Sequence, residues 1–161
     1  MPRVAVGGTF DPLHDGHKAL LMKAVELGRD GELLIGLTSD KMAKNKNHKV
    51  DDYRSRYNEV MKFINEHGVV PRIVILEDPY GPTITEYFDF LVVSPETLPI
   101  GLKINRIRTE KNMEPLKIVL VDYVLADDGL PISSTRIRNG EIDNHGKVLK
   151  DIKRTRIIST K

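Results

Sequence analysis

The sequence has no cysteine and no tryptophan among its 161 residues, and aromatic side chains make up only 6% of it. Without cysteine the chain forms no disulfide, no thiol nucleophile and no cysteine-ligated metal site. It also lacks a continuous apolar run of about eighteen residues, which a helix needs to cross a bilayer. The chain begins Met-Pro-Arg and enters an apolar run at once, which leaves no room for a signal peptide. We therefore expect a cytoplasmic protein with no membrane partner.

An excess of charge of one sign is absent as well. Lys and Arg number 25 and Asp and Glu number 23, so the formal net charge is only +2. A balance of this kind gives no reason to expect nucleic acid as a partner. A chain of this length most simply forms one domain, which buries about 70% of its unfolded surface. We expect a single domain over residues 1–161, with residues from about 144 to 161 as a basic C-terminal tail.

Short apolar runs alternate with stretches that have helical character. The expected strands are residues 3–6, 32–37, 72–76, 90–93 and 117–121. The expected helices are residues 16–27, 52–66, 97–111 and 133–138, and glycine or asparagine follows the last turn of each. Near-continuous apolar strands are typical of a parallel sheet that is covered on both faces. The alternation therefore predicts an α/β fold with a doubly wound, five-stranded parallel sheet and right-handed crossovers.

Residues 7–17 form the motif with the densest chemistry, Gly-Gly-Thr-Phe-Asp-Pro-Leu-His-Asp-Gly-His. The motif lies where the first strand leads into the first helix, whose unpaired N–H groups and dipole attract phosphate. Glycines let a phosphate approach the backbone, and Thr9 adds a hydroxyl. His14 and His17 are three residues apart, so both imidazoles are expected on one face of the first helical turn, directed at the ligand. The alternative is a glycine turn with two exposed histidines, but the whole constellation favours a phosphate site.

Three consecutive hydroxyl residues, Ser133, Ser134 and Thr135, stand at the start of the last expected helix. Hydroxyls in this place either cap the helix or donate to phosphate oxygens. The residues themselves leave both uses open.

The motifs together resemble those of the nucleotidyltransferase superfamily, whose members carry Gly-Thr-Phe-Asp followed by His-x-Gly-His. The segment Ile-Ser-Ser-Thr-x-x-Arg at residues 132–138 is similar to the second signature of the phosphopantetheine adenylyltransferases. Asp-Pro-Tyr-Gly-Pro-Thr at residues 78–83 and Val-Val-Ser-x-Glu-Thr at residues 92–97 resemble the archaeal and eukaryotic branch of that family. The resemblance runs from Arg3 to about Ile142 and leaves out only the tail.

This resemblance implies a Rossmann-like nucleotidyltransferase fold and adenylyl transfer from ATP to 4′-phosphopantetheine. The products would be dephospho-coenzyme A and pyrophosphate, in coenzyme A biosynthesis. The resemblance also implies Mg²⁺ bound with ATP and held by no protein ligand, and two small-molecule partners, ATP and 4′-phosphopantetheine. Two alternatives remain open: another small nucleotidyltransferase that uses FMN, NMN or CTP, and a noncatalytic module that binds nucleotide or RNA.

The resemblance also assigns residues. It implies catalytic roles for His17 and Lys41. It implies ATP binding by Gly8, Thr9, Phe10, His14, His17, Ile132, Ser133, Ser134, Thr135 and Arg138. Binding of the acceptor substrate falls to Thr9, Lys41, Tyr80 and Ser94. The bacterial branch has an arginine-rich loop where this chain has residues 94–97, so Lys103, Arg106 and Arg108 are the candidates to supply the missing charge.

Overall fold

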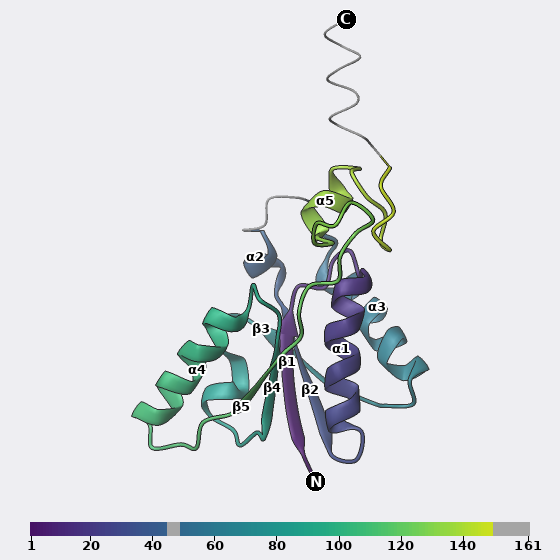
Figure 1. Cartoon of the computed structure of the whole chain (residues 1–161). Helices are drawn as coiled ribbons and strands as arrows, with labels where there is room; N and C mark the ends of the chain where they lie inside the picture. The colour runs from purple at the N-terminus through teal and green to yellow at the C-terminus, as the bar shows by residue number, and fades with distance from the viewer. Residues whose placement is uncertain (45–48, 150–161) are drawn as a thin grey trace, which may run out of the picture.

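A parallel sheet of five strands forms the centre of the molecule in the computed structural model, which describes residues 1–44 and 49–149 (Figure 1). The strands are β1 (Arg3–Gly8), β2 (Glu32–Thr38), β3 (Arg72–Leu76), β4 (Phe90–Val93) and β5 (Lys117–Leu120). Their spatial order is β3-β2-β1-β4-β5, and every neighbouring pair is parallel. The chain thus builds outward from β1 to one edge and then returns to the other side of β1. The predicted doubly wound α/β fold is confirmed, and the reversal beside β1 is where such sheets bind ligands.

Helices cover both faces of this sheet (Figure 1). One face packs against α1 (Asp15–Gly28) and α3 (Tyr53–Glu66), and the other against α4 (Leu98–Glu110) and the 3₁₀ turn η1 (Gly81–Ile84). Neighbouring residues of β1 divide between the two cores, because side chains alternate along a strand: Val4 and Val6 pack with α1, and Ala5 packs on the side of α4. Both faces are therefore apolar, as the unbroken apolar runs predict.

A separate group of residues covers the carboxyl end of the sheet. We call residues 124–149 the cap; it contains α5 (Ser134–Arg138) and a small core of Ala126, Ile132 and Ile142. Sequence analysis assigned residues from about 144 to a tail, but residues 144–149 belong to the cap. Val148 pairs with Ile142 in an antiparallel bridge, and the side-chain amide of Asn144 donates to the carbonyl of Leu13 at 3.1 Å. The rest of that tail, residues 150–161, lies outside the described residues.

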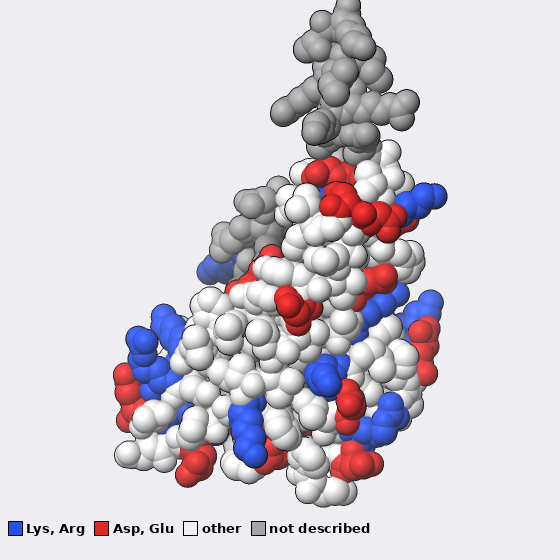
Figure 2. Space-filling model, in the orientation of Figure 1, with Lys and Arg blue, Asp and Glu red and all other residues white. Residues whose placement is uncertain are grey.

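Two short elements were not expected from the sequence: α2 (Asp40–Ala43) and η1, of four residues each. Four residues are too few to show a hydrophobic period. Positive and negative side chains lie interspersed on the face shown in Figure 2. Within residues 1–44 and 49–149, no helix is both long enough and apolar enough to cross a membrane.

Candidate active site

Two pockets lie on either side of the carboxyl end of β1. Gly7, Gly8 and Thr9 line both of them, and so does Thr97 at the start of α4. We name them by the helix that forms one wall: the α1 pocket, between the start of α1 and the cap, and the α4 pocket, between the sheet, η1 and α4. Two ligands, one in each pocket, would meet over residues 7–9.

The α1 pocket brings together the two sequence motifs. Every residue predicted to bind ATP lines it except Arg138, namely Gly8, Thr9, Phe10, His14, His17, Ile132, Ser133, Ser134 and Thr135. The other walls come from residues 94–97 after β4 and residues 121–124 after β5. Residues more than a hundred positions apart therefore form one pocket, as the predicted topology requires.

His14 caps α1 rather than projecting from its first turn, which corrects the expectation from its spacing. Its ring is buried, with 5% exposure, and Nδ1 accepts from the N–H groups of Gly16 at 3.0 Å and His17 at 3.3 Å. Burial lowers the pKa of His14 to about 4, although the charge of Asp15 opposes this shift. The ring is therefore neutral at pH 7, and its proton is on Nε2 because Nδ1 is an acceptor.

His17 is held by contacts on two sides. Its Nδ1 accepts from the backbone N–H of His14 at 3.4 Å, and the two imidazoles stack with ring centroids 3.7 Å apart. Phe10 meets His17 edge-on at 5.4 Å. Phe10 is buried and has a φ of 53°, a left-handed conformation that costs a bulky residue about 1–2 kcal/mol. This backbone conformation and the stacked rings fix the direction of the His17 imidazole.

The hydroxyl residues of the late motif divide between structure and pocket. Ser133 is the N-cap of α5, and its Oγ accepts from the N–H of Arg136 at 3.2 Å. Ser134 and Thr135 line the α1 pocket. Ser94, predicted to bind the acceptor, also lines the α1 pocket rather than the α4 pocket, and its N–H donates to Thr97 Oγ1 at 2.9 Å.

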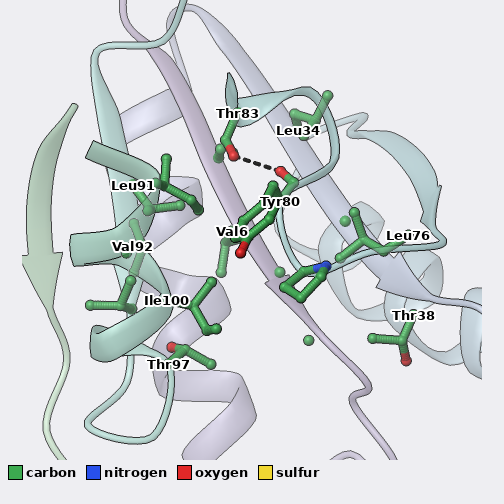
Figure 3. Close-up of a pocket in the computed structure, with 18 of the residues that line it drawn as sticks. Val6, Leu34, Thr38, Leu76, Tyr80, Thr83, Leu91, Val92, Thr97 and Ile100 are labelled. Atoms are coloured by element: carbon green, nitrogen blue, oxygen red, sulfur yellow. Dashed lines mark hydrogen bonds between the residues drawn. The ribbon is translucent and has the colours of Figure 1, made fainter. Parts of the chain in front are cut away.

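The α4 pocket is mostly apolar (Figure 3). In Figure 3, Leu91 and Ile100 lie on one side, Leu76 lies on the other, and Tyr80 projects between them from the loop before η1. Gly36 lies in this lining, and a Cβ there would lie 2.9 Å from the Leu76 side chain, which would have to shift. The pocket therefore suits a ligand with apolar groups, and Tyr80, which was predicted to bind the acceptor, lies in its lining.

Two predicted cations lie outside the linings of both pockets. Lys41 is exposed on α2, from which its neighbour Met42 lines the α4 pocket. Arg138 donates from Nη2 to both carboxylate oxygens of Asp11 at 2.9 Å, and Asp51 Oδ2 lies 3.7 Å from the same nitrogen. Arg138 thus ties the late motif to the early one and does not line the α1 pocket with the other residues predicted to bind ATP.

The three candidate cations of α4 have different surroundings. The ammonium nitrogen of Lys103 lies 5.7 Å from the centroid of the Tyr80 ring, at the α4 pocket. Arg106 is exposed, and Arg108 is buried with 1% exposure. Lys103 and Arg108 therefore both contact a residue of the α4 pocket lining, Lys103 the Tyr80 ring and Arg108 the carbonyl of Thr83.

Arg56 is a site residue to which sequence analysis gave no role. It is buried, with 1% exposure, and donates to Thr38 Oγ1 at 3.2 Å and to the carbonyl of Thr9 at 3.4 Å. It also donates to the carbonyl of Asp51 at 2.8 Å and to the Asp40 carboxylate at 3.1 Å. Arg56 thereby joins the ends of β1 and β2 beneath both pockets. Its place on α3 gave no signal, because helix periodicity assigns a charged residue to the solvent face.

Comparison with known proteins agrees with this geometry. The family model described as Cytidylyltransferase-like matches residues 5–140. Phosphopantetheine adenylyltransferase of Methanosarcina barkeri is 54% identical over 156 residues, which cover 95% of this chain and 96% of the relative. The enzyme of the same name from Archaeoglobus fulgidus is 45% identical over 148 residues, covering 91% and 99%. The chain belongs to the cytidylyltransferase-like family and, within it, to the archaeal phosphopantetheine adenylyltransferases.

Two solved structures share the fold. A crystal structure of a protein with unknown function from Archaeoglobus fulgidus aligns with a TM-score of 0.70 and 44% identity, over 74% of this chain and 89% of that one. A lipopolysaccharide core biosynthesis protein from Thermoplasma volcanium aligns with a TM-score of 0.58 and 26% identity, over 75% and 96%.

Proposed function

We propose that the protein transfers the adenylyl group of ATP to 4′-phosphopantetheine, giving dephospho-coenzyme A and pyrophosphate in coenzyme A biosynthesis. The observation that carries this proposal is the pair of unlike pockets that meet at residues 7–9. One pocket offers N–H donors and hydroxyls, and the other offers apolar walls. These are the two chemistries that a nucleotide and a phosphorylated pantetheine arm require.

ATP binds in the α1 pocket in this proposal. Gly8, Thr9 and Phe10 lie along it, His14 and His17 present Nε2 donors, and Ser134 and Thr135 donate to phosphate from the opposite wall. The start of α1, a helix of fourteen residues, adds its dipole to this attraction. Ile132 packs under the nucleotide, Ser133 caps α5, and Arg138 acts through Asp11.

The acceptor binds in the α4 pocket, with its arm along the apolar floor beside Tyr80 and its phosphate toward Thr9. Lys41 supplies a cation for that phosphate from the rim of the sheet. Ser94 stands on the other side of Thr97 and holds the loop that separates the pockets. The reacting oxygen and the α-phosphate then meet at the end of β1.

The reaction forms a bond between an acceptor phosphate oxygen and the α-phosphorus and breaks the bond from that phosphorus to the leaving pyrophosphate. Two like unit charges about 4 Å apart repel by about 4 kcal/mol at an effective dielectric constant of about 20. Donors such as His17 Nε2–H must therefore offset the charge that develops in the transition state. The nucleophile needs no general base, because a phosphate monoester has a second pKa of about 6.

Mg²⁺ accompanies ATP in this proposal. Within residues 1–44 and 49–149, no group of three His, Asp or Glu side chains is arranged to hold a metal ion. Phosphate oxygens and water are the usual ligands of Mg²⁺ at nucleotide sites, so the ion fits as part of the bound nucleotide. It supplies neutralisation of phosphate charge, and we assign no side chain to it.

A panel of acceptors assayed with ATP tests the function. Pyrophosphate release is measured with 4′-phosphopantetheine, FMN and NMN, and CTP is tested in place of ATP. We expect the highest kcat/KM with ATP and 4′-phosphopantetheine. Faster turnover with another pair would change the substrate assignment, and salt-dependent RNA binding without pyrophosphate release would indicate a noncatalytic module. The cytoplasmic location remains a prediction.

A further inference from the structure

Arg108 is a buried arginine whose hydrogen-bond partners are backbone carbonyls. It lies on α4 with 1% exposure. Its Nε donates to the carbonyl of Glu114 at 2.7 Å, and its Nη1 donates to the carbonyls of Thr83 at 2.7 Å and Glu86 at 2.8 Å. Burying a charge is costly unless it is well bonded, and within the described residues no carboxylate forms an ion pair with Arg108.

The two carbonyls bound by Nη1 belong to the loop that forms a wall of the α4 pocket. Tyr80, Pro82 and Thr83 line the pocket from this loop, and Thr83 Oγ1 donates to the carbonyl of Tyr80 at 2.5 Å (Figure 3). A second cation of α4, Lys111, donates to the carbonyl of Ile84 at 2.6 Å. The loop is therefore bonded to α4 and its C-cap residue through three backbone carbonyls, those of Thr83, Ile84 and Glu86.

The other end of α4 forms the facing wall. Thr97, Ile100, Gly101 and Ile104 line the same pocket directly. One helix thus provides one wall with its first half and holds the opposite wall with its second half. The Arg108 guanidinium links the second half of α4 to this loop.

We propose that Arg108 is a positioning residue for recognition of the acceptor substrate, because it fixes the Tyr80–Thr83 wall at the width that the apolar arm requires. This inference rests on the proposed function. It also removes Arg108 from the candidates that supply charge to phosphate, since the side chain is buried and its Nε and Nη1 donate to carbonyls. The α1 pocket receives no residue from this loop, so the effect is confined to the acceptor.

The test compares Arg108→Lys and Arg108→Gln with Glu110→Gln, a control at an exposed position of the same helix. Circular dichroism checks that each variant folds, and kcat and both KM values are measured with ATP and 4′-phosphopantetheine. We expect the acceptor KM to rise about tenfold for Arg108→Gln, which corresponds to about 1.4 kcal/mol, and less for Arg108→Lys. The KM for ATP should stay within about twofold of the wild-type value in the Arg108 variants, and both KM values should do so in Glu110→Gln.

A second acceptor distinguishes positioning from general loosening. 4′-Phosphopantothenate lacks the terminal thiol-bearing arm. Its KM should therefore rise less than the KM for 4′-phosphopantetheine when the wall moves. Equal losses with both acceptors, or lower thermal stability with an unchanged ratio of the two KM values, would overturn the role of Arg108. If neither Arg108 variant folds, Lys111→Gln replaces them, and an unchanged acceptor KM then overturns the proposal. A wild type inactive with 4′-phosphopantetheine would instead overturn the proposed function.

Discussion

The α1 pocket and the α4 pocket share the end of β1 but are built in different ways. The α1 pocket takes its donors from two short motifs, and its histidines hold each other through local hydrogen bonds. The α4 pocket takes its walls from strands, a turn and a helix that are far apart in the chain, and buried arginine brings them together. The difference indicates that chemistry is encoded locally in this fold, whereas the shape of the acceptor pocket depends on long-range packing.

The largest effect is expected for His17→Ala in the α1 pocket. A donor to developing charge in the transition state contributes to the rate more than to ground-state binding, so kcat should fall about 10²-fold or more. The assay is steady-state pyrophosphate release at saturating concentrations of both substrates. His67→Ala, at the C-terminal cap of α3, serves as the control. A near-normal kcat would show that His17 is a structural residue, and the α1 pocket would then lose its proposed role in the chemistry.

Low pH should destabilise the protein, because His14 is buried in its neutral form. Its pKa falls from 6.5 in the unfolded chain to about 4 in the folded protein, so between these values the unfolded state binds more protons. Stability should therefore be full above pH 6.5 and decrease by about 3 kcal/mol as the pH falls to 4. Urea unfolding at several pH values measures this. His14→Asn keeps an N-cap but cannot titrate, and an equally steep loss in that variant would assign the pH dependence to other groups.

Lys41→Ala tests whether this lysine binds the phosphate of the acceptor substrate. If Lys41 holds that phosphate, the KM for 4′-phosphopantetheine should rise about tenfold, with a smaller change in kcat. Lys44→Ala, the next exposed lysine, is the matched control. Both variants are compared with the wild type at saturating ATP. A rise in the KM for ATP, with the KM for 4′-phosphopantetheine unchanged, would place Lys41 at the ATP site and contradict this role.

Ser134→Ala and Ser133→Ala separate binding from capping with a small effect. Ser134 lines the α1 pocket, so its loss should raise the KM for ATP about threefold and leave that for 4′-phosphopantetheine unchanged. Ser133 caps α5, so its loss should cost about 1 kcal/mol of stability. Substrate titrations and thermal unfolding measure the two effects. Should Ser134→Ala alter stability alone, its hydroxyl is structural.

The sequence by itself determined the layers of the fold and the two motifs that meet in the α1 pocket. Strand positions follow from short β-branched runs, and those runs are local signals. Residues 7–17 and 132–138 meet because parallel strands present all their carboxyl ends at one edge of a sheet. Once the strands were assigned, the sequence therefore predicted that these two motifs lie close together.

Only the tertiary structure decided the partners of the arginine side chains on the helices. Arg56, Arg108 and Arg138 each lie on a helix, where sequence patterns predict solvent or ligand, yet each bonds to a segment distant in the chain. The placement of residues 144–149 in the cap also required contacts between distant parts of the chain, such as the bond from Asn144 to the carbonyl of Leu13. The physical reason is the same in each case. A long or polar side chain is buried only where several distant donors or carbonyl groups satisfy it, and no local pattern specifies those partners.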